Sequence, residues 1–273
     1  VRLAELSGGK LQIQVYPSGM IGSEAECLKQ AQNGQVDLAK TSTAVLESSV
    51  PEITAIGLPY VFRDEEHFWK VLNGPIGKEL AERLPAMRGL VYYDAGTRNF
   101  YTTKKPIRSV NDLKGLKIRT QQSRSAMDMV SAFGGAPTPI PFGELYTALS
   151  QGTVDGAENN LPSFGTGRHM EVCKYFTFSE HVMVPDLLVV SRATWDSLTE
   201  EERRWLQTAA DESGVLERKL WAEADERALA RAKELGVEFI KVDKAPFAKK
   251  MEKLYESYTG ETADLIRRIR EVK

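Results

Sequence analysis

Polar side chains follow several of the short apolar segments that read as β-strands in this sequence. Open α/β sheets bind ligands beyond the carboxyl ends of their strands, so polar groups at such positions are expected to line a cleft. The candidates at these positions are Lys40, Thr41, Ser42, Asp94, Arg98, Arg119, Gln121, Glu158 and Asn159.

Arg119 has the best-defined chemistry of these residues. It follows Leu116-Lys117-Ile118, and strand alternation places it on the face opposite Leu116 and Ile118. A guanidinium group matches a carboxylate through two parallel hydrogen bonds. Arg98 is predicted at the end of an adjacent strand and would supply a second cation. The competing interpretation of Arg119 is a salt bridge to one of the 38 acidic residues.

Structural explanations compete with binding at other positions as well. Phe142 and Tyr146 have the i, i+4 spacing of a helix and are typical of a core. Asn159 could serve a turn or donate its amide to a ligand. Glu24 falls in the first turn of a predicted helix, where it would compensate the helix dipole. The patterns favour structural roles for His169 and His181.

The elements that would position these residues include two segments of similar sequence, Gln32–Lys40 and Ser150–Glu158. Each reads as a helix that ends at glycine, followed by a short strand that begins at Val-Asp. The repetition predicts two related lobes, which would face each other across a cleft.

Hydrophobic periodicity and capping signals predict the remaining elements. Ser23 and Glu26 form a capping box for a helix that runs to Gln32. The predicted strands are Lys10–Tyr16, Val36–Ala39, Gly89–Tyr93, Leu116–Thr120, the segment at Val154, Leu187–Ser191 and Val237–Val242. The predicted helices include Asp64–Leu72, Ile76–Leu84, Ser123–Phe133, Phe142–Leu149, Phe164–Lys174 and segments within Pro246–Val272, and a proline-stiffened connection covers Ala136–Pro141.

The longest predicted helix begins at Thr199 with an acidic first turn and continues to Leu235. At 1.5 Å per residue, about 36 residues would measure roughly 54 Å. This exceeds the diameter of one lobe, so the helix is predicted to lie across both, with Gly214 as a weak point.

Composition and motifs exclude several classes of function. The 36 basic and 38 acidic residues give a net charge of −2, which argues against nucleic acid as a partner. No apolar run is long enough to span a bilayer. Cys27 and Cys173 fall in different predicted lobes, so no disulfide is expected, and the three histidines lack metal-ligand spacing. Phosphate-loop, nucleophile-elbow and dinucleotide motifs are absent, which favours a binding protein over a catalyst.

Several longer motifs resemble one protein family. They are Asp112–Arg119, Pro137–Leu149, Val154–Asn159, Tyr16–Gly19, Leu58–Asp64 and Trp195–Leu198. Together they resemble the solute-binding subunit of tripartite ATP-independent periplasmic (TRAP) transporters, in the C4-dicarboxylate-binding-protein family. Members begin with a signal peptide and a first strand, whereas Val1–Leu6 reads as the last turns of a helix, so we expect this sequence to begin inside an element.

The resemblance implies a two-lobe α/β periplasmic solute-binding protein fold, with a central cleft and a long helix that spans both lobes. Residues 1–95 and 185–224 would form the first lobe, and residues 96–184 and 225–273 the second. The chain would deliver its solute to membrane permease subunits that use an ion gradient, with no cofactor, no metal and no catalysis of its own.

The resemblance also assigns roles to residues of this sequence. Arg119 matches the arginine that clamps the ligand carboxylate, Arg98 a second basic position, Asn159 an asparagine at the carboxylate, and Phe142 an aromatic that packs on the ligand. Glu24 and Ser42 match positions that contact polyhydroxylated ligands in sialic-acid-type members, although Ser42 replaces an acid there.

Three further segments resemble the sequences of the branch associated with sugar acids such as uronates. They are Ala157–Asn160, Arg168–Lys174 and Glu180–Asp186. Lys40, Thr41, Asp94, His181 and Asp186 would add donors and acceptors suited to a hydroxyl-rich ligand.

Two alternatives stay open at this point. One is a receptor for a C4-dicarboxylate or 2-oxo acid, in which Arg98 would take the second charged group. The other, from a different class, is a cleft enzyme acting on a small carboxylate with Glu158 or His181 as base. A regulator's effector domain is disfavoured because no helix-turn-helix segment is present.

Overall fold

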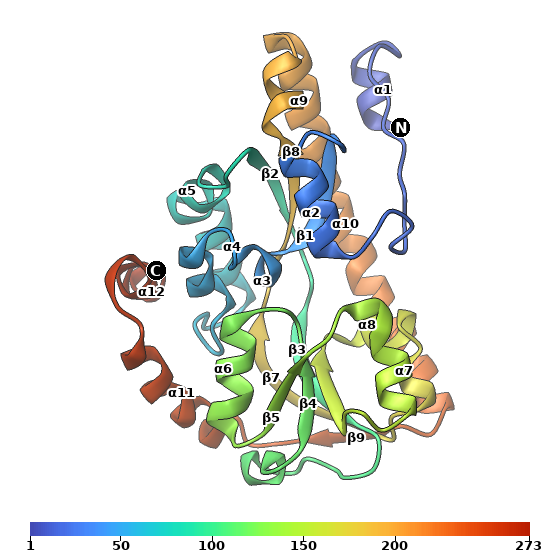
Figure 1. The fold of residues 1–273 in the computed structure, drawn as a ribbon, viewed down its shortest axis with the longest axis vertical. Coiled ribbons are helices and arrows are strands. Elements are labelled where there is room, and N and C mark those ends of the chain that lie inside the picture. The colour runs from blue at the N-terminus through green and yellow to red at the C-terminus, as the bar shows by residue number, and fades with distance from the viewer.

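The structure, a computed structural model, describes residues 1–273 and is built on two β-sheets (Figure 1). The three-stranded sheet has the order β1-β8-β2, with β1 at Leu38–Ser42, β2 at Met87–Tyr93 and β8 at Asp186–Ser191. The six-stranded sheet has the order β5-β4-β6-β3-β7-β9. Its strands are β3 (Thr97–Thr102), β4 (Lys117–Thr120), β5 (Ala136–Pro139), β6 (Gly156–Asn159), β7 (Tyr175–Met183) and β9 (Glu238–Lys241). The predicted two-lobe α/β fold is confirmed.

Helices cover both sheets. Those packed around the three-stranded sheet are α1 (Arg2–Leu6), α2 (Glu24–Gln32), α3 (Thr43–Leu46), α4 (Glu65–Asn73), α5 (Pro75–Glu82), α9 (Arg192–Ser197), α12 (Gly260–Glu271) and the 3-10 helix η1 (Pro51–Gly57). Those around the six-stranded sheet are α6 (Arg124–Phe133), α7 (Leu145–Ser150), α8 (Leu161–Thr166), α11 (Ala245–Ser257), and the 3-10 helices η2 (Val110–Leu113), η3 (Phe142–Glu144) and η4 (His169–Glu171). None of the helices combines the length and apolarity needed to cross a membrane.

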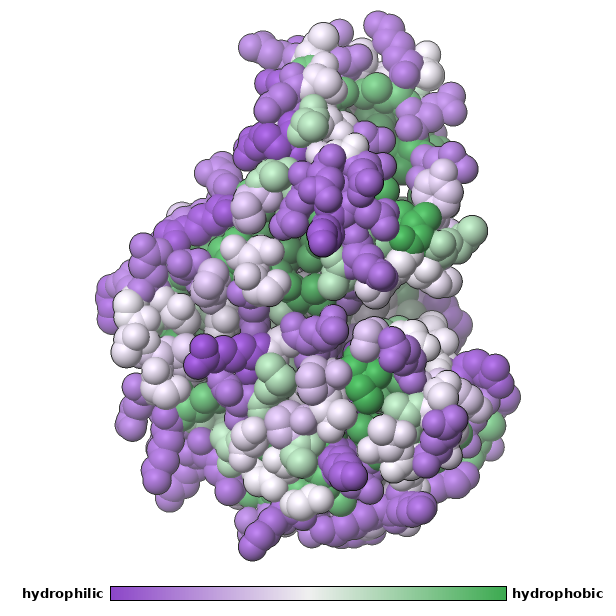
Figure 2. Space-filling model, in the orientation of Figure 1, coloured by the Kyte–Doolittle hydropathy of each residue, from purple (hydrophilic) through white to green (hydrophobic).

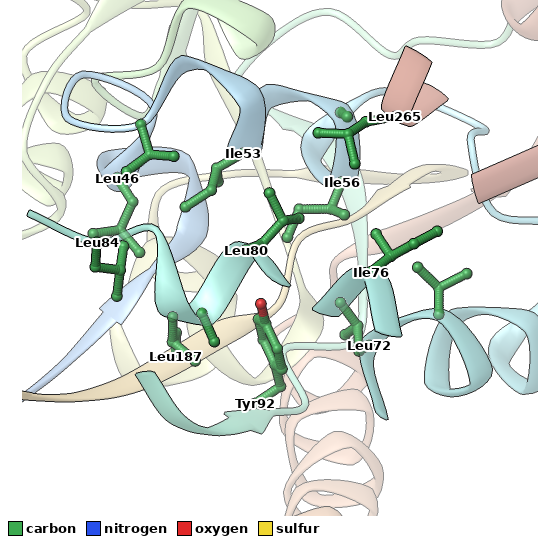
Figure 3. Close-up of a cluster of buried hydrophobic side chains, with 14 of the residues drawn as sticks. Leu46, Ile53, Ile56, Leu72, Ile76, Leu80, Leu84, Tyr92, Leu187 and Leu265 are labelled. Atoms are coloured by element: carbon green, nitrogen blue, oxygen red, sulfur yellow. The ribbon is translucent and has the colours of Figure 1, made fainter. Parts of the chain in front are cut away.

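The apolar run of β8 explains its central place in the three-stranded sheet. Leu187 and Val189 enter the core formed with α3, α4 and α5, in which Leu46, Leu80 and Tyr92 also lie (Figure 3). Val190 points to the opposite face, where it joins Leu206 of the long helix. A strand covered on both faces is apolar without alternation.

The long helix α10 runs unbroken over Glu200–Glu234. Thr199 caps it through a capping box with Glu202. It packs on β2 at one end and on α8 at the other, so it links the two lobes as predicted (Figure 1). Gly214 does not break it. A Cβ there would lie 2.8 Å from Cγ2 of Val91, so this glycine lets the helix approach β2 closely.

The two segments of similar sequence fold as predicted. α2 ends at Gln32 and α7 ends at Ser150, and each is followed by a glycine in the left-handed region, Gly34 at φ +71° and Gly152 at φ +72°. A strand follows each glycine, β1 in one sheet and β6 in the other. Cys27 and Cys173 are free thiols, as expected.

The prediction of a strand at Lys10–Tyr16 is wrong. The segment is irregular because no strand lies beside it to complete a ladder. Of its alternating apolar residues, Leu11 packs beside α10, whereas Ile13 and Val15 are 50% and 74% exposed. Alternation alone therefore misidentified it.

Three further predictions of secondary structure are corrected. Ala136–Pro141 is not merely a connection, because β5 pairs with β4 at the edge of the sheet, where prolines are tolerated. The helix predicted over Phe164–Lys174 is divided into α8 and η4 by Gly167 and by Arg168, which has φ +60°. Arg98 lies within β3 and not at the end of β2, since the chain changes sheets over residues 94–96. The nine-residue strand β7 is absent from the prediction.

Packing also bears on the division into lobes. Phe247 and Met251 of α11 pack with the six-stranded sheet, whereas Leu265 and Ile269 of α12 enter the core of the three-stranded sheet. The predicted division places residues 225–273 in the second lobe. We propose that α12 belongs with the first lobe instead.

We predict that Gly77→Ala destabilises the first lobe. A Cβ at Gly77 would lie 1.9 Å from the carbonyl oxygen of Leu72, a backbone atom that cannot yield without moving α4. Overpacking of this kind costs about 1–3 kcal/mol, which lowers the midpoint of thermal unfolding by several degrees in a chain of this size. Gly143→Ala is the control, because nothing lies within 4 Å of its added Cβ. Equal midpoints for both variants would contradict the prediction.

Candidate functional site

The guanidinium of Arg119 is a buried cation without an ion-pair partner. Its strand β4 is held between β5 and β6, and only 3% of the residue's surface is exposed. Nε donates to the carbonyl oxygen of Ile140 at 2.7 Å, but Nη1 is buried with no hydrogen-bond partner. Burial lowers the pKa of Arg119, and the nearby positive charge of Arg98 adds to that effect. Since an unsatisfied buried donor costs about 1–3 kcal/mol, the arrangement points to an anionic ligand.

Arg98, in contrast, is fully engaged within the protein. Its Nε pairs with Oε2 of Glu158, and its Nη2 donates to Oε1 and to the backbone oxygen of the same residue, both at 2.7 Å. Both side chains are buried. Burial alone would raise the pKa of Glu158, but the Arg98 charge and hydrogen bonds from His181 and Arg98 lower it to about 2. Arg98 therefore contributes no free positive charge.

His181 lies behind this pair and not beside Arg119. Its Nε2 is 3.4 Å from Oε2 of Glu158, and its Nδ1 is 2.9 Å from Oγ of Ser179. The ring stacks on Phe100 and is completely buried. Burial lowers the pKa of His181.

Asn159 presents a donor whose orientation is fixed. Its Oδ1 accepts hydrogen bonds from Nη1 of Arg98 and from the backbone N–H of Asn160, both at 2.9 Å. The amide NH2 must therefore point the other way. That NH2 donates to no protein atom and is not sealed from solvent. Arg98 thus sets which end of the Asn159 amide is offered.

An aromatic group completes the second-lobe side of the site. Phe142 is 39% exposed and makes an edge contact with His169, with 5.4 Å between ring centroids. Nδ1 of His169 lies 2.9 Å from the Tyr101 hydroxyl, and its Nε2 is buried without a partner. Burial and the Arg119 charge lower the pKa of His169 to about 4. The sequence pattern favours a structural role for His169, whereas its unpaired nitrogen makes it a further candidate.

The first lobe supplies an acidic wall opposite Arg119. Glu24, in the first turn of α2, accepts the backbone N–H of Ser42 at 3.2 Å. Burial and the charge of Asp186 raise the pKa of Glu24, while Arg119 acts in the opposite direction. Glu24 and Arg119 are therefore close enough to interact by charge, although no bond joins them.

Lys40 and Asp186 continue this wall. Nζ of Lys40 lies 2.5 Å from Oδ2 of Asp186, and 51% of the Lys40 side chain is exposed. The negative charge of Asp186 also helps to raise the pKa of Arg98 in the second lobe. Figure 2 shows the surface drawn in between the two lobes.

Other predicted residues have local roles. Ser42 accepts the N–H of Ala44 and caps α3. Thr41 is completely buried and donates to the backbone oxygen of Ser42. Asp94 accepts the N–H of Gly96 at the crossing between the sheets. Gln121 is also buried, just beyond β4.

Glu217 is a candidate that the sequence analysis missed. Its Oε2 accepts the N–H of Asp94 at 2.9 Å. Burial, together with the negative charges of Asp94 and Asp186, raises its pKa to about 7. Nothing in the helical pattern of α10 distinguishes this glutamate, because only the folded chain brings it to the end of β2.

Two hollows lie away from Arg119. One of about 230 Å³ is lined by Tyr60, Glu180 and Lys244, and Lys244 pairs with Glu180. Another of about 750 Å³ lies between α6 and α11 and is rimmed by lysines. Neither is lined by a buried polar atom that lacks a partner. The space between Arg119 and Glu24 is therefore the better candidate for a ligand site.

We predict that substitutions of Arg98 and Glu158 have non-additive effects on the free energy of unfolding, because the two side chains form an ion pair. Arg98→Met or Glu158→Leu alone leaves one buried charge unpaired and should cost about 3–5 kcal/mol of unfolding free energy. The double variant removes both charges and should cost less than either single variant. Urea denaturation measures all four proteins, and additive losses would contradict the pairing.

Acid titration supplies the control for this prediction. A carboxyl with a depressed pKa stabilises the folded state above its unfolded pKa, and this contribution is lost as the pH falls toward the folded value. Glu158 should therefore contribute to a loss of stability between about pH 4 and pH 2. The double variant should lose less over the same interval.

Comparison with known proteins agrees with this geometry. The model of the family "Bacterial extracellular solute-binding protein, family 7" (DctP) matches residues 2–261. The uncharacterised protein YiiZ of Salmonella typhimurium is 36% identical over 259 residues, which are 93% of this chain and 79% of that protein.

Solved structures superimpose closely. A TRAP periplasmic solute-binding protein from a Bradyrhizobium species, in complex with α/β-D-galacturonate, is 40% identical with a TM-score of 0.96 and covers 99% of this chain and 92% of its own. One from Pseudomonas putida F1, with bound D-glucuronate, is 36% identical with a TM-score of 0.95 and covers 100% and 90%. The chain belongs to the DctP family of bacterial extracellular solute-binding proteins, the receptors of TRAP transporters.

Proposed function

We propose that this protein is the periplasmic receptor for a uronate, D-galacturonate or D-glucuronate, which it delivers to the membrane permease of a TRAP transporter. The observation that carries the proposal is the buried Arg119, whose guanidinium has an Nη1 without a partner. The two similar solved structures described above hold those two sugars.

The two walls divide the recognition of such a ligand. Arg119 would bind the carboxylate through parallel hydrogen bonds, and the NH2 of Asn159 would donate beside it. Phe142 would pack on the apolar face of the sugar ring. Glu24 and Asp186 would accept hydrogen bonds from hydroxyl groups on the opposite wall. Closure of the lobes would bring both walls onto the ligand.

Members of this family are solute-binding receptors, so the alternative of an enzyme is set aside. The groups considered as a base also fit structural roles. Glu158 is ion-paired and buried, and His181 is sealed behind it.

A thermal-shift assay tests the proposed ligands. A ligand at 100 times its Kd stabilises the folded protein by about 2.7 kcal/mol, which should raise the unfolding midpoint by roughly 5–10 °C for a chain of this length. We expect this shift with D-galacturonate or D-glucuronate and none with D-galactose or D-glucose. Equal shifts with a uronate and its neutral sugar would exclude a carboxylate clamp, and no shift with either uronate would overturn the proposed function.

Arg119→Met separates binding from folding. The variant should lose about 2–5 kcal/mol of binding free energy, as expected when a buried charge partner is removed. Without ligand it should unfold at a higher temperature than the wild type, because an apolar side chain replaces a buried cation that lacks an ion-pair partner.

Lys117→Met, two residues earlier on the same strand and exposed, should change neither property. An Arg119→Met protein that is less stable and still binds uronate would show that Arg119 is structural.

A further inference from the structure

We infer that the cleft selects sugar acids with one carboxylate and rejects the corresponding dicarboxylates, the aldarates, because the wall opposite Arg119 is acidic and its lysine, Lys40, is already ion-paired. This inference rests on the proposed function and deepens it. An aldarate carries a second carboxylate where a uronate has its aldehyde carbon, so it stays open-chain, whereas a uronate can close into a ring. When Arg119 holds one carboxylate, the second charge of an aldarate would meet the wall that faces Arg119.

The charges of that wall are one-sided. Glu24 accepts the N–H of Ser42, which pairs with Asp186 between β1 and β8, so the two acids are neighbours. Glu24 also interacts by charge with Arg119. Glu217 adds a further acid close to Asp186. When Arg119 holds the first carboxylate of an aldarate, the second would be placed next to these acids. Like charges brought together in a site with little water oppose binding.

Two cations that could relieve this repulsion are already paired. Lys40 is the basic residue of the first-lobe wall, and its Nζ lies 2.5 Å from Asp186. Arg98, which a dicarboxylate receptor would need as its second clamp, is held by Glu158 on two of its nitrogens. Both are neutralised within the protein, whereas Arg119 has no carboxylate partner.

The same acids suit a hydroxyl-rich ligand. A carboxylate accepts several hydrogen bonds and donates none, so it pairs with sugar hydroxyl groups, which can donate. Glu24 uses one oxygen for the N–H of Ser42, which leaves its other oxygen for a ligand. An acidic wall therefore favours a uronate while it excludes the related diacid.

Calorimetric titration at pH 7.5 with D-galacturonate, galactarate and D-galactose tests the inference. We expect wild-type protein to bind galacturonate and to bind galactarate at least about 30-fold more weakly, as like-charge juxtaposition requires. Glu24→Gln keeps an acceptor for Ser42 but removes the charge, so it should narrow this ratio mainly through tighter binding of galactarate. Glu201→Gln, an exposed acid in the first turn of α10, is the control and should leave the ratio unchanged.

A measurement on the wild type at pH 5.5 gives a second test that needs no substitution. Glu24 faces Asp186, Lys40 and Arg119, and Glu217 faces Asp94, Asp186 and Lys40. The pKa values of both glutamates are raised, that of Glu217 to about 7, so more of the wall is neutral at the lower pH. The difference in affinity between galacturonate and galactarate should therefore be smaller at pH 5.5 than at pH 7.5.

The outcomes distinguish this inference from the proposed function. Equal affinity for galacturonate and galactarate, or an unchanged ratio in Glu24→Gln and at pH 5.5, would overturn the inference and leave a uronate receptor. Binding of galactarate that is lost in Lys40→Met would likewise overturn it, by showing that Lys40 leaves Asp186 to clamp a second carboxylate. Failure of the wild type to bind either D-galacturonate or D-glucuronate would overturn the proposed function and the inference together.

Discussion

A cation held away from water without a counter-ion is the constraint on which the site depends. Moving a charged group into a protein interior costs several kcal/mol unless a partner repays it. Arg119 receives one hydrogen bond acceptor, the carbonyl of Ile140, and no carboxylate. The strands β5 and β6 on either side keep its strand in place, so the side chain cannot simply leave for solvent. In the proposed function the ligand would supply the missing charge, and folding would prepare the site before the ligand arrives.

In the proposed function, the neighbouring Arg98–Glu158 pair would make this site selective. Two arginines in one lobe would otherwise form a site suited to diacids. Because Glu158 neutralises Arg98 and the Asn159 amide is fixed by the same guanidinium, the second-lobe wall offers one positive charge and one oriented neutral donor. The first-lobe wall adds negatively charged carboxylates, which accept hydrogen bonds. The polarity of the cleft, positive at one end and negative at the other, follows from which charges are paired internally.

Local sequence signals predicted the elements that carry the site, but not the pairing within it. Capping boxes and glycines after helices are local signals. The capping boxes at Ser23 and Thr199 therefore identified the starts of α2 and α10, and the glycines identified the ends of the helices in the two segments of similar sequence. The resemblance to TRAP receptors indicated Arg119, and a match of residues 2–261 confirms the family. The engagement of Arg98 by Glu158 joins residues 60 apart, and the contact of Glu217 with Asp94 spans 123 residues. Periodicity holds no information on such contacts. The same limit explains the error at Lys10–Tyr16, since a strand needs a partner that alternation cannot reveal.

The segments between the sheets determine how the two walls can meet. The chain crosses at residues 94–96 and 184–185, and α10 bridges both lobes. Hydrogen bonds between the lobes add to these links. Ser123, the N-cap of α6, donates to Glu47 of the first lobe at 3.0 Å, and the backbone N–H of Tyr60 donates to the oxygen of His181 at 2.9 Å.

Two residues at this junction are held in the left-handed region, Tyr60 at φ +58° and Glu180 at φ +41°. Conformations of this kind cost of order 1–3 kcal/mol each and persist only where surrounding contacts impose them. The side chain of Asn99 accepts a hydrogen bond from the N–H of Glu180. Asn99 follows Arg98 on β3, where the pairing register with β7 is interrupted. Bending at this junction would therefore move the first-lobe acids relative to Arg119 while the Arg98–Glu158 pair, which lies wholly within the second lobe, stays intact. In the proposed receptor, closure of the two walls on a ligand would leave the Arg98–Glu158 pair undisturbed.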